Sequence, residues 1–212
     1  MKMIQAITAS LFLALALVSG TALAADNDDA FAYQDITPAV PTTSGDKIEV
    51  VEMFWYGCPH CYAFEPVLNE WKAHLPKDVA FIRVPAIFNP KWEFTARIYY
   101  TADVLGVLDK MHEHIFDAIH KQHRPLASVP EVAALFEQYG VSKQEFENTF
   151  NSFAVNSKVN WARHLTKAYG IDGVPTMIVD GKYRTSASLA GGHEEVLKVV
   201  DALIARERKA AH

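Results

Sequence analysis

The feature that most constrains this chain is the junction at residues 48–75, where an apolar run passes through one glycine into a helical pattern. Residues 48–55 are β-prone and almost continuously apolar, which is typical of a central strand that is buried on both faces. Gly57 ends this run. The apolar residues that follow fall on one face of a helix: Phe64, Val67, Leu68, Trp71 and Leu75. A buried strand that leads directly into a helix predicts an α/β core.

Further strand signals stand on either side of a long helical segment. Residues 79–84 alternate like a second strand, and residues 176–179 and 183–188 flank the hairpin signal Asp180-Gly181. Residues 89–170 carry helical signals only, enough for four or five short helices, and a last helix follows Gly191-Gly192. Residues 26–45 are polar, and we expect an extended arm or a first edge strand there. The predicted order is β-α-β, an all-helical insertion, then β-β-α.

The N-terminal residues have the pattern of a secretory signal peptide. Lys2 precedes a short apolar run at 11–18, and Ala22-Leu23-Ala24 is a small-x-small cleavage site. The run is well short of the roughly 20 residues that span a bilayer. We expect cleavage after about Ala24 and export to an oxidising compartment. The predicted organisation is a signal peptide at 1–24, the α/β core at 25–88 and 171–212, and the helical insertion at 89–170.

The composition excludes several classes of protein. A net charge of −5 argues against a nucleic-acid binder, which usually carries a basic surface. Two cysteines are too few for a four-cysteine zinc site or a cysteine-ligated iron–sulfur cluster. The chain has no glycine-rich phosphate loop or dinucleotide fingerprint, so we expect no cofactor.

The two cysteines stand at the start of the first predicted helix, in the motif Cys58-Pro59-His60-Cys61. Helix N-termini present unpaired N–H groups and a partial positive charge, which lower the pKa of a thiol placed there. We therefore expect Cys58 to be the exposed, attacking sulfur and Cys61, one turn deeper, the buried, resolving one. Pro59 suits the first helical position. His60 adds a donor or a positive charge beside Cys58.

Other uses of the cysteine pair are weaker. A zinc site would need two more ligands, for which His112 with His114, or His120 with His123, are the candidates; neither pair has an obvious link to the cysteines. Haem attachment needs His directly after the second Cys, where this chain has Tyr62. A purely structural disulfide stays open, although so short a loop removes little chain entropy.

With Val174-Pro175-Thr176 far downstream, the Cys58-Pro59-His60-Cys61 motif resembles that of the DsbA family of thioredoxin-fold disulfide oxidoreductases. Pro175 lies 114 positions after Cys61, and the helical segment fills that interval. The resemblance implies a redox-active Cys58–Cys61 disulfide and a cis proline, Pro175, beside the active sulfur. It also implies that Val174 and Pro175 bind substrate, and that the thiol is strongly oxidising.

Glu52 lies six residues before Cys58 in the predicted central strand. Alternation puts it on the face of Val50 and Phe54. Its carboxyl group is therefore either buried beneath the cysteines or reaches solvent at an edge of the sheet. A buried carboxyl has a raised pKa and can exchange a proton with a thiol. Family members carry an acid at the matching position, which favours this role. We identify no buried cation to pair with Glu52, and expect Arg83 to be solvated.

The chain is therefore expected to be a periplasmic thiol:disulfide oxidoreductase that introduces disulfides into reduced or unfolded secreted polypeptides. The resemblance implies a quinone-linked membrane protein as its re-oxidant. We expect a monomer, since the chain has no spare segment for a dimerisation domain. The alternatives are a disulfide isomerase or reductase, and a redox-inert peptide- or metal-binding module on the same fold.

Overall fold

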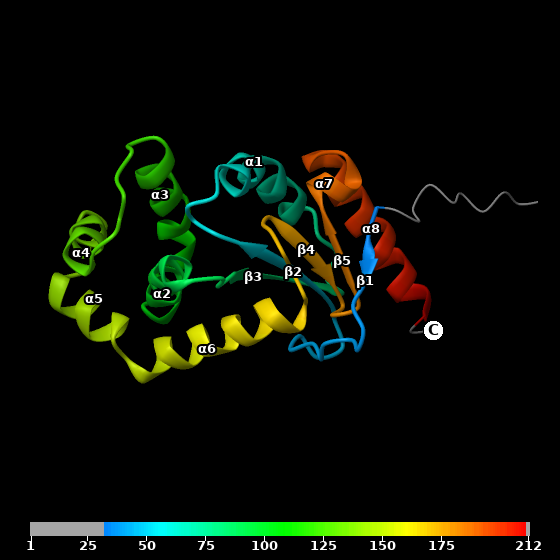
Figure 1. Cartoon of the computed structure of the whole chain (residues 1–212), viewed down its shortest axis with the longest axis horizontal. Helices are drawn as coiled ribbons and strands as arrows, with labels where there is room; N and C mark the ends of the chain where they lie inside the picture. Colours follow the sequence, from blue (N-terminus) through cyan, green and yellow to red (C-terminus); the bar gives the residue numbers. More distant parts are fainter. Residues whose placement is uncertain (1–31, 211–212) are drawn as a thin grey trace, which may run out of the picture.

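A five-stranded mixed sheet lies at the centre of residues 32–210, the part of the chain that the structure, a computed structural model, describes. The strands lie in the order β1-β5-β4-β2-β3 (Figure 1). They are β1 (Gln34–Asp35), β2 (Ile48–Phe54), β3 (Val79–Pro85), β4 (Thr176–Val179) and β5 (Tyr183–Ser186). The predicted signal peptide at residues 1–24 lies outside the described residues.

The strand β2 is the predicted central strand. It pairs in parallel with β3 and antiparallel with β4, and every residue after Ile48 is buried. Its register with β3 sets Glu52 opposite Arg83. Because directly opposed residues of paired strands point to the same face of a sheet, these two side chains share a face.

Each face of the sheet carries its own apolar core; alternation along β2 predicts the positions of Val50, Val51 and Met53, but Phe54 at the end of the strand belongs to the core of Val51 and Met53 instead of that of Val50. On one face Val50 packs with residues of α1 (Pro59–Ala73) and α8 (His193–Ala210). On the other face Val51 and Met53 join the core of the helical segment. Cys58 and Cys61 belong to this second core, so the cysteine pair lies where the helical segment meets the sheet.

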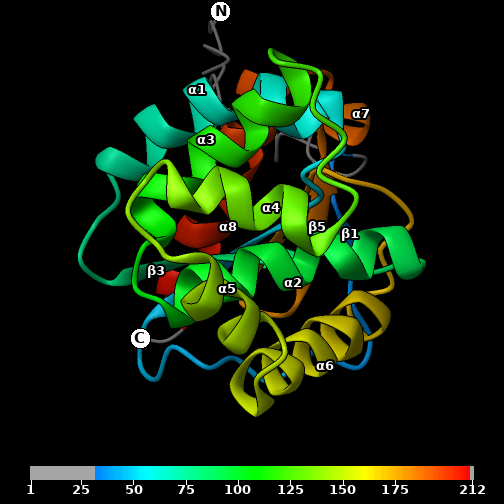
Figure 2. The same cartoon turned by 90° about the vertical axis from the view of Figure 1, so that its left-hand side faces the viewer.

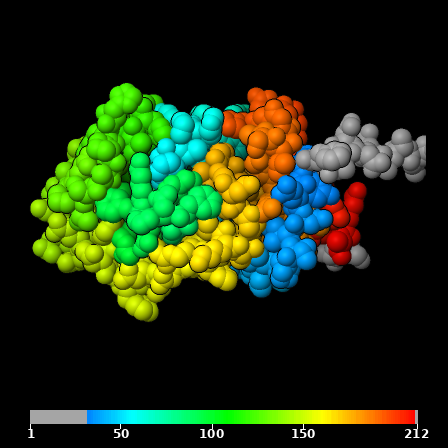
Figure 3. Space-filling view, viewed as in Figure 1, coloured from blue at the N-terminus to red at the C-terminus, as the bar shows by residue number. Residues whose placement is uncertain are grey.

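Five helices lie between β3 and β4, where the helical insertion is predicted. They are α2 (Pro90–Val104), α3 (Leu108–His120), α4 (Val129–Glu137), α5 (Lys143–Phe150) and α6 (Phe153–Ala168). Figure 2 faces this block, and in Figure 3 it forms the green and yellow end of the molecule. No helix within residues 32–210 is both long and apolar enough to cross a bilayer.

The C-terminal hairpin differs from the expectation in one respect. The returning strand ends at Ser186 instead of Ser188, because the Ser186 hydroxyl caps the short helix α7 (Ala187–Ala190) by accepting the Leu189 N–H at 3.4 Å. Of the two alternatives for residues 26–45, the described part includes the edge strand, since β1 pairs antiparallel with β5.

We expect Gly181→Ala to destabilise the fold strongly. Gly181 has a φ of +64°, and a Cβ there would lie 1.9 Å from the backbone oxygen of Val40. Val40 also donates its N–H to the Gly181 oxygen at 2.9 Å, so the clash would break the link between the N-terminal arm and the β4–β5 turn. The left-handed conformation alone costs about 1–3 kcal/mol. Denaturant unfolding measures the total loss.

Gly45→Ala is the matched control, because Gly45 has a φ of +63° and no atom within 4 Å of the added Cβ. This variant should lose only the part of the free energy of unfolding that comes from the left-handed backbone conformation. Equal losses in the two variants would show that the contact with Val40 has no effect on stability.

Candidate active site

Cys58 is the N-cap residue of α1, at the end of the loop that leaves β2. Its backbone is extended, with φ −89° and ψ 117°, and its sulfur accepts a hydrogen bond from the backbone N–H of Cys61 at 3.4 Å. The Cys58 N–H itself donates to the Trp55 oxygen at 2.9 Å, which closes the loop. Pro59 is the first helical residue, and the first turn contains no acidic side chain. The free N–H groups of α1 therefore face the Cys58 sulfur without a competing negative charge.

The two sulfur atoms have opposite electrostatic environments. Both cysteines are free thiols in this structure. The hydrogen bond from the Cys61 side chain, with smaller contributions from backbone N–H groups and from the charge of His60, lowers the pKa of Cys58 to about 6. Burial raises the pKa of Cys61 well above its ordinary value. At neutral pH the pair therefore holds one thiolate and one thiol.

Cys58 is less exposed than the sequence suggests. It is 7% exposed against 0% for Cys61, so the expected order is right but the attacking sulfur is only just accessible. Its sulfur lies 3.5 Å from the carbonyl oxygen of Val174. The Val174–Pro175 bond is cis, as the resemblance implies. Segments separated by more than a hundred residues thus cover the sulfur from two sides.

A groove of about 400 Å³ runs past the cysteine motif on the Pro175 side. His60, which is exposed, forms part of its wall. The other lining residues are Asp172, Gly173, Val174, Pro175, Thr176, Ser186, Ala187, Ser188 and His193. The groove therefore brings together three of the predicted site residues: His60, Val174 and Pro175.

Glu52 is fully buried, as one of the two alternatives requires. The expectation of a solvated Arg83 is wrong, because the Arg83 side chain is only 10% exposed and its Nε donates to Glu52 at 2.9 Å. Arg83 also contacts Glu65 at 3.0 Å. Burial raises the pKa of Glu52 to about 8, although the charge of Arg83 opposes this shift. The other carboxylate oxygen of Glu52 has no hydrogen-bond partner within residues 32–210.

Two of the histidines considered as zinc ligands, one from each candidate pair, have other partners. His112 contacts Tyr56 and Glu65, and His120 contacts the backbone oxygen of Tyr56 at 2.8 Å. Across residues 32–210 no cluster of three or more His, Cys, Asp or Glu side chains has the arrangement of a metal site.

Comparisons with known proteins agree with this geometry. The family model of the DSBA-like thioredoxin domain matches residues 81–203. The thiol:disulfide interchange protein DsbA of Pseudomonas aeruginosa is 46% identical over 200 residues, which cover 93% of this chain and 95% of that protein. The chain belongs to the DsbA family.

Further relatives extend the likeness to structure. The DsbA of Pseudomonas syringae is 48% identical over 179 residues, or 84% of each chain. The crystal structure of Pseudomonas aeruginosa DsbA matches with a TM-score of 0.82 at 46% identity, over 86% of this chain and 95% of that one. That of DsbA from Xylella fastidiosa matches with a TM-score of 0.80 at 38% identity, over 84% and 96%. This DsbA-family chain is a thiol:disulfide oxidoreductase with a thioredoxin fold and a helical insertion.

Sequence reasoning missed Glu65 in this DsbA-family site, expected Arg83 to be solvated, and considered His112 only as a zinc ligand. Glu65 lies four residues after Cys61 on α1, and residues at that spacing share a helix face, so a signal was available. Arg83 becomes identifiable only once the β2–β3 register is known. His112 comes from α3, and no local pattern shows which face of that helix meets the sheet.

We expect the reduced protein to show a thiolate titration with a midpoint near pH 6, against an ordinary thiol value of 9.0. Ultraviolet absorbance of the thiolate against pH measures it, and Cys58→Ser should remove the transition. Cys61→Ala should raise the midpoint, because it removes the side-chain hydrogen bond that lowers the pKa most. Cys61→Ser, which keeps a donor, should raise it less. A wild-type midpoint near 9 would refute the electrostatic picture.

Proposed function

We propose that this oxidoreductase works as an oxidase that introduces disulfide bonds into reduced, unfolded secreted polypeptides. The observation that supports it best is the contrast between Cys58, with a pKa of about 6, and Cys61, with a raised pKa. A thiol of low pKa is a good leaving group in disulfide exchange. A mixed disulfide at Cys58 is therefore resolved in favour of the client's own disulfide.

The proposed reaction has two exchange steps. A client thiolate attacks Cys58 of the oxidised enzyme; the Cys58–Cys61 bond breaks, a bond between Cys58 and the client forms, and Cys61 leaves with the electron pair and takes up a proton. A second client thiolate then attacks the client sulfur of the mixed disulfide, and Cys58 leaves as a thiolate. The client loses two electrons and two protons. Cys61 keeps one proton, and the other goes to solvent.

Glu52 is the proposed source of the proton for Cys61. Cys61 is fully buried, so solvent does not reach its sulfur directly. Glu52 lies near enough for its charge to contribute to the raised pKa of Cys61. A carboxyl with a pKa of about 8 is protonated at neutral pH and can donate as the sulfur leaves.

The groove on the Pro175 side is the proposed client site. An extended chain that lies there passes within reach of Cys58, whose sulfur is 3.5 Å from the Val174 oxygen. Main-chain groups of Val174 would pair with it, as in strand addition. Pro175 would hold this segment beside the sulfur.

The compartment and the partners follow from the family and the sequence. We propose a periplasmic protein, in line with the predicted signal peptide and the DsbA relatives. The reduced form requires a re-oxidant, for which a quinone-linked membrane protein is the proposal. We propose that it acts as a monomer.

The function is tested with a reduced client protein and stoichiometric oxidised enzyme. The wild type should form the client disulfide in a single turnover. Cys61→Ser should accumulate mixed disulfides on non-reducing gels, because the resolving thiol is absent, and Cys58→Ser should form none. Equal trapping by both variants would reverse the assigned roles. A wild type that only reduces client disulfides, and forms none in a glutathione redox buffer, would replace the oxidase by a reductase.

We expect Glu52→Gln to slow the opening of the Cys58–Cys61 disulfide by at most about a hundredfold, the low end of acid–base effects. An acidic aromatic thiol, which stays ionised throughout, is the attacking reagent, so that the pH profile reports the enzyme alone. The wild-type rate should fall above pH about 8 as Glu52 ionises. The variant's rate should not fall there. Identical profiles would leave Glu52 without a role in proton exchange.

The same variant should gain stability relative to the wild type as the pH rises. The folded-state pKa of Glu52 is raised from 4.5 to about 8, so the native state holds a proton that the unfolded state has lost in this window. The wild type therefore loses stability between these pH values, and a neutral glutamine does not. Denaturant unfolding at the two ends of the window provides the comparison.

A further inference from the structure

A continuous line of hydrogen bonds connects Glu52 to a histidine of the helical insertion. Arg83 Nε donates to Glu52 at 2.9 Å, and its Nη2 donates to Glu65 at 3.0 Å. The other oxygen of Glu65 lies 3.3 Å from His112 Nε2. His112 Nδ1 in turn lies 2.8 Å from the hydroxyl of Tyr56, two residues before Cys58. The line thus begins beside Cys61 and returns to the loop that carries Cys58.

The partners of His112 determine its tautomer. The hydrogen bond from His112 and, after it, the charge of Arg83 hold the pKa of Glu65 below its usual value despite its burial, so Glu65 is a carboxylate and only accepts. His112 Nε2 must therefore carry the proton. Burial lowers the pKa of His112, so the ring is neutral and its Nδ1 accepts from the Tyr56 hydroxyl. The neutral His112 ring therefore donates to Glu65 through Nε2 and accepts from Tyr56 through Nδ1, so both ring nitrogens have a partner.

Arg83 is shared between two carboxyl groups that compete for it. Glu65 takes two hydrogen bonds from Nη2, at 3.2 and 3.0 Å, and Asn69 accepts from the same nitrogen at 3.0 Å. Glu52 receives only the bond from Nε. With Glu65 ionised, Arg83 is already neutralised, and the negative charge of Glu65 also disfavours a second anion at Glu52. Burial is the main reason that Glu52 stays protonated, and the position of Glu65 determines how strongly Arg83 opposes it.

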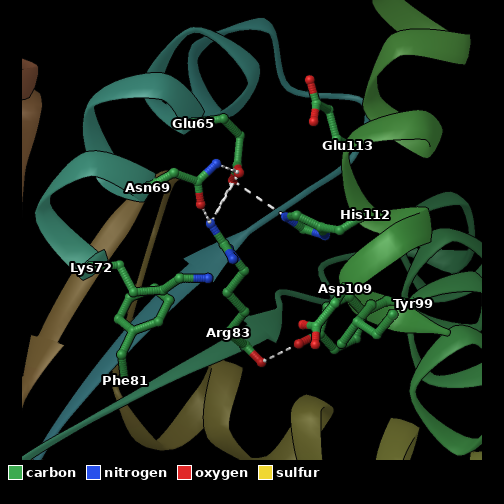
Figure 4. Close-up of a pocket in the computed structure, with 10 residues that line it drawn as sticks. Glu65, Asn69, Lys72, Phe81, Arg83, Tyr99, Asp109, His112 and Glu113 are labelled. Carbon is green, nitrogen blue, oxygen red and sulfur yellow. Dashed lines mark hydrogen bonds and ion pairs between the residues drawn. The ribbon is translucent and has the colours of Figure 1, made fainter. Parts of the chain in front are cut away.

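His112 contributes to holding Glu65 in that position, at the wall of a pocket that both residues line. Figure 4 shows Glu65 between the guanidinium of Arg83 and the imidazole of His112, at the wall of a pocket of about 260 Å³. Glu65 also accepts from Asn69 Nδ2 at 3.2 Å, so loss of the bond from His112 would leave the carboxylate held by Asn69 and Arg83 alone, at the wall of the pocket. Glu52 is 0% exposed, so its carboxyl group cannot turn toward solvent.

We propose that His112 is a positioning residue for disulfide exchange: by holding Glu65 against Arg83, it keeps Glu52 protonated and ready to supply Cys61. The inference rests on the proposed function, in which Glu52 supplies that proton. It adds a residue of the helical insertion to a reaction whose sulfur atoms lie on α1. Several other titratable groups face Glu52 or His112 from the packed elements: Tyr56, Cys61, Lys72, Tyr99, Asp109 and Glu113.

The test is the pH profile for the reaction of the oxidised, full-length mature protein with the acidic aromatic thiol. His112→Leu should reach its own plateau only below about pH 6, and the readout is the position of the falling limb relative to that plateau. The substitution should move the fall near pH 8 toward lower pH by about one unit, which is a tenfold loss of rate on the falling limb. His112→Gln should restore the wild-type profile, because an amide can donate to Glu65 and accept from Tyr56. A merely structural histidine would change the unfolding midpoint without moving this limb.

His114→Leu is the matched control on the same helix. The His114 ring stacks on the Tyr139 ring with 4.2 Å between the ring centroids. His114 takes no part in the hydrogen bonds that connect Glu52 to His112, so its loss should leave the profile unchanged. If His112→Leu does not fold, Glu65→Gln decides the question. It keeps an acceptor for His112 but removes the charge that competes for Arg83, and the limb should again move to lower pH.

The outcomes separate this inference from the proposed function. An unmoved limb in folded His112→Leu or in Glu65→Gln, or an equal shift in His114→Leu, overturns the role of His112. A wild-type rate with no fall above pH 8 overturns the inference through Glu52, while oxidation of the reduced client still supports the oxidase. Failure of the oxidised wild type to react with the thiol overturns the proposed function itself.

Discussion

The first turn of α1 stabilises a negative charge on the Cys58 sulfur, and the rest of the site is arranged around that interaction. It requires a sulfur at the N-cap, which in turn requires that β2 ends at Phe54 and that the chain enters the helix within four residues. The same helix carries Cys61 one turn inward, where exposure falls to 0%. One element thus lowers the pKa of one thiol and raises that of its neighbour. The thiolate at Cys58 and the thiol at Cys61 differ in pKa, and this difference determines which sulfur leaves in each step of disulfide exchange.

Burial of Cys61 creates a second requirement, because in the proposed exchange its proton comes from inside the protein. The chain places a cation, Arg83, and two carboxyl groups, Glu52 and Glu65, beneath the cysteines. A simple buried ion pair would keep Glu52 ionised. The competition from Glu65 weakens that pairing, and burial then favours the protonated form of Glu52. The cost of burying charge is offset by the hydrogen bonds that Arg83 makes to three different side chains.

The helical insertion does more than cover the sheet. Its helix α3 contacts Tyr56 at both ends, through His112 at the hydroxyl and through His120 at the backbone oxygen. From α2, the Tyr99 hydroxyl donates to the Arg83 oxygen at 3.2 Å. Two groups of α3 therefore fix the loop before Cys58, and a group of α2 fixes the backbone of β3 at Arg83. This explains how residues outside the core fold take part in the electrostatics of its cysteines.

The local features of this protein are predictable from its amino-acid sequence. The strand-to-helix junction, the N-cap position of Cys58, the deeper Cys61 and the β-β-α ending all follow from periodicity and from short-range geometry, and the downstream Val174-Pro175 segment was recognised by its motif. Other features depend on how the chain packs: Arg83 is buried against Glu52, His112 contacts Glu65, and Cys58 retains just 7% exposure. These depend on strand register and helix docking, which join residues far apart along the chain. No local pattern encodes which of two distant polar side chains will meet, because the packing of everything between them determines it.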